Sequence, residues 1–118
     1  RAFRGRAEIA TDEAVNPELS EFKADVVIRA PNRAPVAVFL VMGDAKLYEA
    51  MLLQTEADLK ARVPCRVVAL MERDSSVSRK AFSHAMNRLI PLRYRGDEQT
   101  AISRIVRETL NQPAGLLN

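Results

Sequence analysis

The sequence is poor in the residues that covalent cross-links and nucleophilic catalysis require. Its 118 residues include one cysteine, one histidine and no tryptophan. A single cysteine, Cys65, excludes an internal disulfide and lacks the companions that a cysteine-based zinc site needs, so we expect an inert, packed thiol in a reducing cytoplasm. No orienting partner for His84 is apparent in the sequence, and we interpret it as a surface histidine and not as a catalytic base.

Glycine and long apolar runs are also scarce. The glycines stand at positions 5, 43, 96 and 115 and do not cluster, which excludes a glycine-rich phosphate loop. The longest apolar runs, residues 34–42 and 67–71, are far shorter than the roughly 20 residues that cross a bilayer, so we expect no membrane partner. The chain opens without an initiator methionine or a signal-peptide segment, and we expect the C-terminal domain of a longer protein.

Composition indicates one globular domain that spans residues 1–118. Hydrophobic residues make up 47% of the chain and charged residues 28%, which argues against disorder and low complexity. The 18 basic residues are nearly balanced by 15 acidic ones, and the formal net charge is +3. This balance permits a polyanionic partner without requiring one.

Hydrophobic patterning predicts alternating strands and helices in the second half of the chain. Strands are expected at residues 3–9, 24–29, 36–42, 66–71 and 92–95, and helices at 45–62, around 81–89 and from 97 onwards. The helix inner faces are expected to carry Ala45, Tyr48, Leu52 and Leu59 in the first, Ala81, Phe82, Ala85, Met86 and Leu89 in the second, and Ile102, Ile105 and Val106 in the third. The predicted fold is a three-layer α/β domain with a mixed sheet, in which an antiparallel hairpin precedes a β-α-β-α-β-α succession.

Three residues near the ends of the predicted hairpin strands suggest phosphodiester chemistry. Asp25 lies near the start of the first strand, and Asp44 and Lys46 follow the second. Two carboxylates can hold Mg²⁺, and a lysine can orient a water or offset phosphate charge. The pattern resembles the PD-(D/E)XK restriction-endonuclease-like superfamily over residues 22–108. The resemblance implies Asp25 and Asp44 as metal ligands, Lys46 as the catalytic lysine, and Glu8 or Glu18 as an additional acid.

The chain departs from that family in two places. In the family the acid-x-lysine triplet lies on the second hairpin strand, whereas the residues opposite Asp25 here, around 39–41, are apolar. Ala24 replaces the proline that precedes the first aspartate. We therefore expect a catalytically degenerate branch, bacterial or phage-related, that needs no cofactor and serves binding or assembly. The alternative is an active Mg²⁺-dependent nuclease. A third interpretation gives the three residues purely structural roles, with Asp44 as a helix N-cap, Lys46 as a solvated residue and Asp25 as a locally hydrogen-bonded carboxylate.

A second acidic rim is predicted where two parallel strands end. Asp44, Glu72 and Asp74 would meet there, at the edge where open α/β sheets bind ligands. We favour the simpler interpretation, in which residues 72–76 form a charged loop and Asp74 or Ser76 caps the following helix.

A run of basic residues without any acid is the best candidate for a binding surface. It comprises Arg79, Lys80, Arg88, Arg93 and Arg95. Such a stripe can follow a phosphate backbone, and it is equally typical of a solvated helix and a charged edge strand. The sequence therefore predicts a domain that binds DNA, RNA or a protein partner through this surface, with a structural module that associates with itself as a further alternative.

Overall fold

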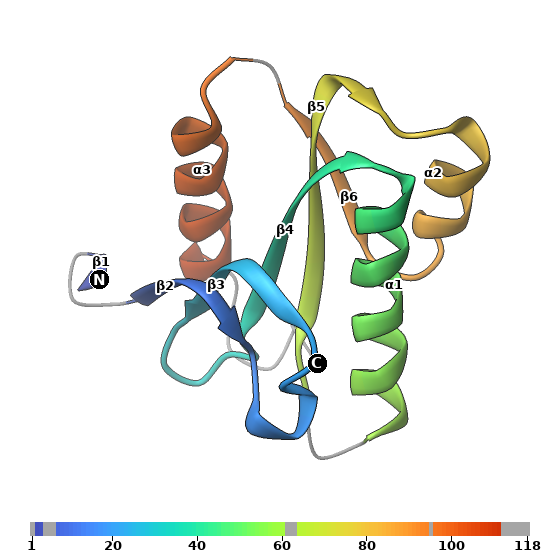
Figure 1. Ribbon diagram of the computed structural model, residues 1–118. Helices are drawn as coiled ribbons and strands as arrows, with labels where there is room; N and C mark the ends of the chain where they lie inside the picture. The colour runs from blue at the N-terminus through green and yellow to red at the C-terminus, as the bar shows by residue number, and fades with distance from the viewer. Residues whose placement is uncertain (1, 4–6, 61–63, 95, 112–118) are drawn as a thin grey trace.

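The computed structural model of the protein describes residues 2–3, 7–60, 64–94 and 96–111 (Figure 1). The strands are β1 (Ala2–Phe3), β2 (Ala7–Ala14), β3 (Lys23–Arg29), β4 (Val36–Gly43), β5 (Arg66–Ser76) and β6 (Ile90–Tyr94). The helices are the short 3-10 helix η1 (Pro17–Leu19) and the α-helices α1 (Asp44–Leu59), α2 (Arg79–Ala85) and α3 (Glu98–Asn111).

The six strands form one mixed sheet in which spatial order follows chain order. Strands β1 to β4 pair antiparallel, and β4, β5 and β6 pair parallel. Two helical crossovers make the parallel half, because α1 joins β4 to β5 and α2 joins β5 to β6. The predicted α/β class, the mixed sheet and the hairpin are confirmed. The strand expected at residues 92–95 lies at the sheet edge as predicted, but it begins earlier, at Ile90, and Arg95 lies outside the described residues.

The sheet is covered on both faces, which gives the predicted three layers. Helices α1 and α2 pack on one face and α3 packs on the other, as Figure 1 shows. Strand β4 is central, and its residues Ala37, Val38, Phe39 and Val41 have no exposed surface. A strand buried on both faces is apolar at every position, and this accounts for the continuous apolar run that marks it in the sequence.

The hairpin of β3 and β4 turns at Asn32, whose φ of 60° lies in the left-handed region that asparagine tolerates. The two strands pair Val26 with Val38 and Ile28 with Val36. Continuing this register by one residue places Asp25 opposite Phe39, in agreement with the expectation from the sequence. Apolar residues of β4 therefore lie opposite Asp25.

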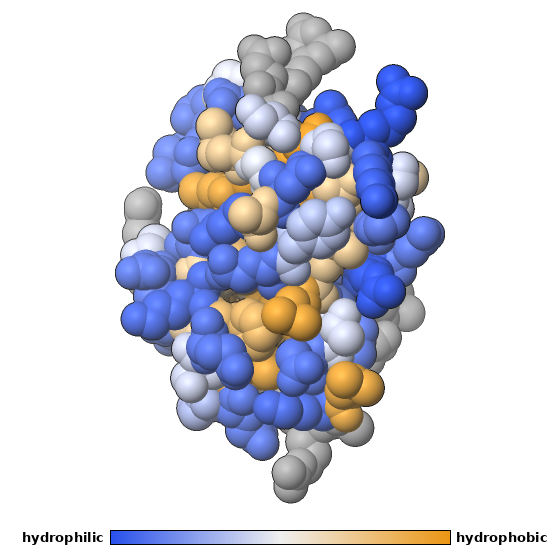
Figure 2. Space-filling model, turned by 45° about the vertical axis from the view of Figure 1, so that its right-hand side comes forward, coloured by the Kyte–Doolittle hydropathy of each residue, from blue (hydrophilic) through white to orange (hydrophobic). Residues whose placement is uncertain are grey.

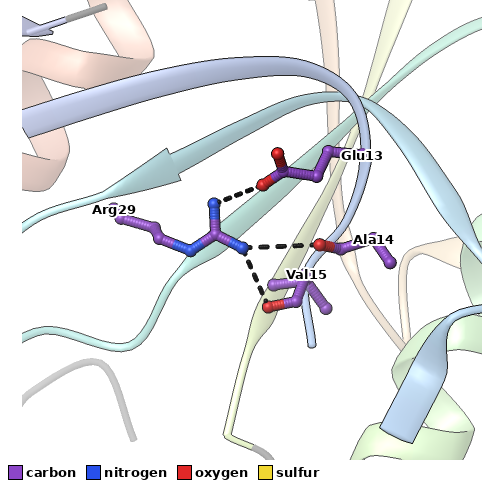
Figure 3. A network of polar contacts seen from close by, with 4 residues as sticks. All are labelled: Glu13, Ala14, Val15 and Arg29. Atoms are coloured by element: carbon purple, nitrogen blue, oxygen red, sulfur yellow. Dashed lines mark hydrogen bonds and ion pairs between the residues drawn. The ribbon is translucent and has the colours of Figure 1, made fainter. Parts of the chain in front are cut away.

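A polar network ties β3 to the end of β2 (Figure 3). The Arg29 guanidinium lies 2.8 Å from the Glu13 carboxylate, and it donates to the carbonyl oxygens of Ala14 at 3.4 Å and Val15 at 3.1 Å. One planar guanidinium thus donates to several acceptors at the end of β2, where the pairing of β2 with β3 stops.

Several predicted boundaries are wrong. The strand expected at residues 3–9 is divided between β1 and β2, and β2 continues to Ala14. Strand β5 extends to Ser76, so Ser78 is the N-cap of α2 in place of Asp74 or Ser76. Helix α2 ends at Ala85, and Met86 is 60% exposed instead of lying on the inner face.

The predicted inner face of α1 is also wrong. Tyr48, Leu52 and Leu59 are exposed, and Ala45 is exposed as well. The helix buries a different set, namely Leu47, Ala50, Met51, Leu53, Gln54 and Ala57. This buried set mixes leucine and methionine with alanine and a polar glutamine, so it gives no stronger sequence signal than Tyr48, Leu52 and Leu59 on the other side of the helix. For α3, the predicted inner residues Ile102, Ile105 and Val106 are confirmed as buried.

Candidate functional site

Asp25 is a half-buried strand residue at the point where β3 separates from β4. Its Oδ2 atom accepts a hydrogen bond from the backbone N–H of Leu40 at 2.8 Å. The last pair assigned between these strands at this end is Val26 with Val38. The carboxylate therefore acts as the acceptor that a neighbouring carbonyl would otherwise supply to Leu40.

Lys46 approaches the same carboxylate from the first turns of α1. Its Nζ atom lies 3.7 Å from Asp25 Oδ2 and 5.4 Å from the centre of the Phe39 ring. Both side chains of the ion pair are about one-third exposed, at 33% and 34%. The structure thus brings Asp25 and Lys46 together, as the sequence pattern suggested.

Asp44, the third residue of the predicted nuclease set, bonds elsewhere. It is the first residue of α1, with Gly43 at the N-cap position, so the predicted capping role of Asp44 is wrong. Its Oδ1 atom accepts from the backbone N–H of Ser78 at 2.7 Å. Hydrogen bonding by the hydroxyl and the backbone N–H of Ser78 lowers the pKa of Asp44. This carboxylate therefore links the start of α1 to the cap of α2.

No cluster of three or more histidine, cysteine or acidic side chains is placed to hold a metal ion among the residues that the structure describes. Of the second predicted rim, Glu72 is exposed on β5, and the side chain of Asp74 lies outside the described part. Glu8 pairs with Arg29 in the β2–β3 ladder, and Glu18 lies in η1.

The basic residues gather on and beside α2. Arg79 and Lys80 occupy its first turn, Arg88 follows its last turn, and Arg93 lies on β6, with all four side chains exposed. We call these four residues the α2 basic surface. The Arg93 guanidinium lies 4.5 Å from the centre of the Phe82 ring, which connects β6 to α2. Arg95 lies outside the described residues.

Helix stability does not account for this placement of charge. Positive side chains are unfavourable at a helix N-terminus, where the backbone dipole is already positive, yet Arg79 and Lys80 stand there. The ion pairs found in the described part of the chain are Arg29 with Glu13 and Lys46 with Asp25, so neither pair neutralises the α2 basic surface.

A groove between α1 and α2 is the feature that sequence reasoning missed. Its volume is about 470 Å³, and it is lined by Tyr48, Met51, Leu52, Thr55, His84, Asn87 and Arg88. His84 is exposed at this groove, which confirms the prediction of a surface histidine. The spacing of Tyr48, Leu52 and Leu59 was a visible signal, but it was assigned to the interior of the protein.

Cys65 is buried immediately before β5, as expected for a packed thiol. Burial, with a smaller contribution from the negative charge of Asp58, raises the pKa of this thiol to about 11. The residue therefore stays protonated near neutral pH and is a poor nucleophile.

Comparison of the chain with protein-family models, with curated proteins and with solved structures gave no match. Within the described ranges, the helices all fall short of the length and apolarity needed to cross a membrane.

Proposed function

We propose that this domain binds nucleic acid through the α2 basic surface, on a nuclease-like fold that has lost its metal site. The observation that carries the proposal is a set of four exposed cations around one short helix, with no acidic residue between positions 75 and 96. Phosphate contacts of this kind supply most sequence-independent affinity. The surface offers no tryptophan platform for stacking bases, so we expect DNA and RNA to bind with similar affinity.

The loss of catalytic function is supported by the partners of the two aspartates. Asp25 is engaged by Leu40 and Lys46, whereas Asp44 is engaged by Ser78. A shared Mg²⁺ would require both carboxylates to give up these hydrogen bonds and to turn towards one point.

Binding is tested by fluorescence anisotropy with labelled 20-mer DNA and RNA across a range of salt concentrations. Each phosphate contact contributes about 0.9 to the slope of log affinity against log salt for duplex DNA and about 0.7 for single strands. Replacing Arg79, Lys80 and Arg93 together by glutamate should weaken binding strongly and lower the duplex slope by about 2 to 3.

The matched control reverses three exposed cations that lie elsewhere, Lys23, Arg104 and Arg107. The two triple variants have the same net charge, so a difference between them reports the location of the binding surface and not the overall charge. Equal affinity and equal slope for both variants would refute the proposal.

The alternative, a metal-dependent nuclease that uses Asp25, Asp44 and Lys46, is tested by cleavage. Plasmid DNA and RNA are incubated with Mg²⁺ or Mn²⁺ and either the unmodified domain or its Lys46→Ala variant. We expect no cleavage by either protein. Cleavage that the variant loses would establish the nuclease in place of the degenerate domain.

A further inference from the structure

The groove between α1 and α2 combines an aromatic ring with polar side chains that can contact a nucleobase. Tyr48 lines it from α1 and is 41% exposed. His84, Asn87 and Arg88 line it from α2 and the residues that follow, and all three are exposed. An aromatic ring can stack on the face of a base, and amide and imidazole groups can form hydrogen bonds with its edge. The volume of about 470 Å³ lies within the range of about 300–1,000 Å³ that is typical of small-ligand sites, so a base fits.

Arg88 connects this groove with the α2 basic surface, because it belongs to both. Its Nη1 atom donates to Thr55 Oγ1 at 3.4 Å, which holds the side chain towards α1. A guanidinium carries five N–H donors, so this long hydrogen bond leaves donors for a phosphate. In Figure 2, hydrophobic side chains are interspersed with strongly hydrophilic ones over the face that α1 and α2 form. Apolar surface for a base and charge for a phosphate thus lie on one face.

The charges around the groove favour a negatively charged ligand along α2. Among the described residues that line the groove, none is acidic. Lys80 lies one helical turn before His84, and residues four positions apart share a side of a helix, so Lys80 borders the groove as well. An adjoining hollow of about 430 Å³ is lined by Asp58, which disfavours a polyanion in that direction. A nucleic acid strand is therefore expected to run from the groove along α2 and away from Asp58.

We propose that the nucleic acid bound by this domain is single-stranded, with one base in the groove against Tyr48 and neighbouring phosphates on Lys80 and Arg88. This inference rests on the proposed function and names its substrate class. The bases of a duplex are stacked and paired, so none enters the groove unless it is flipped out at an energetic cost. A single strand presents the faces of its bases without that cost. The groove therefore favours single strands, whereas the α2 basic surface contributes affinity for any phosphate backbone.

The test compares two labelled single strands with equal numbers of phosphates, by fluorescence anisotropy at one salt concentration. One strand is a thymidylate 20-mer, and the other is a 20-mer of abasic deoxyribose phosphate. We expect the thymidylate strand to bind roughly tenfold more tightly, the usual effect of stacking one base on an aromatic ring. Tyr48→Ala should abolish this preference, whereas Tyr48→Phe should keep it because the ring remains. Neither substitution should change the affinity for the abasic strand or for a duplex.

The matched control is Leu59→Ala, which truncates a side chain of 74% exposure at the end of α1, outside the groove. It should leave the affinity for both strands unchanged. Equal affinity for the thymidylate and abasic strands, or equal effects of Tyr48→Ala and Leu59→Ala, would overturn the assignment of single strands and leave the proposed function in place. The proposed function fails separately, if reversing the charges of Arg79, Lys80 and Arg93 weakens binding of the abasic strand no more than its own control does. Absence of binding to every probe would overturn both.

Discussion

The Asp25 carboxylate should contribute to folding mainly as a hydrogen-bond acceptor. In the Asp25→Ala variant, the half-buried N–H of Leu40 loses its partner at 2.8 Å, and Lys46 loses its counter-ion at 3.7 Å. An orphaned backbone donor costs about 1–3 kcal/mol, and a partly exposed ion pair contributes at most about 1 kcal/mol. Because the site is partly open to water, we expect a total loss of roughly 1–3 kcal/mol in the free energy of unfolding.

The Asp25→Asn variant separates the two contributions. Its amide oxygen can still accept from Leu40 but carries no charge, so the expected loss is about 1 kcal/mol or less. Lys46→Met should give a similarly small loss, which shrinks further in 1 M salt because the ion pair is screened there. The loss caused by Asp25→Ala should persist in high salt.

Urea denaturation followed by circular dichroism measures these differences, with Glu21→Ala as an exposed acidic control expected to stay within about 0.5 kcal/mol of the unmodified domain. If Asp25→Asn destabilised the domain as much as Asp25→Ala, the hydrogen bond to Leu40 would not be the reason for the aspartate. If Lys46→Met had the largest effect, the ion pair would have to dominate instead.

Two further predictions concern polar links made by α1. Gln54 is buried, and its side-chain amide donates to the carbonyl oxygen of Cys65, just before β5, and accepts from the N–H of Val67 in β5. Gln54→Leu should therefore cost roughly 2–5 kcal/mol, against about 0.5 kcal/mol or less for the exposed Gln99→Leu, and equal urea midpoints would contradict this. The lowered pKa of Asp44 contributes stability that is present above the pKa of an unfolded aspartate, near 4, and is lost as pH falls through the lower folded value. In acid titrations, Asp44→Asn should therefore flatten the decline of stability below about pH 4. Ser78→Pro should do the same, because it removes the backbone N–H that donates to Asp44. An unchanged acid profile would contradict this role.

The strands could be predicted because burial on both faces leaves a continuous apolar signal in β4 and β5. Helix faces were harder to predict, because α1 is apolar on two sides. Its buried side depends on Ala50, Ala57 and Gln54, and a glutamine in a core is recognisable only once its backbone partners are known. Those partners are Cys65, just before β5, and Val67 in β5, which lie eleven and thirteen residues away along the chain.

The candidate site could be predicted in part for the same reason. Asp25 and Lys46 meet because the pairing of β3 with β4 and the start of α1 are set locally. Both can be predicted from the positions of the turns in the sequence. Asp44 was assigned incorrectly because its partner, Ser78, caps a helix that begins later than expected, after β5 has extended to Ser76. The observed cap, Ser78, lies only two residues beyond Ser76 and four beyond Asp74, but its backbone N–H is the donor that the Asp44 carboxylate contacts.

The position of Asp25 also explains why function should be sought on the surface of α1 and α2. A metal site in the superfamily arrangement needs an acid on β4 opposite Asp25, where Phe39 and Val41 are fully buried in the core beneath α1. A carboxylate at either position would be desolvated among apolar side chains, a cost that only a bound cation could offset. With apolar residues there, Asp25 accepts from Leu40 and pairs with Lys46. Among the residues that the structure describes, the cations around α2 are an exposed feature that folding does not explain, and the proposed function assigns nucleic acid to that surface.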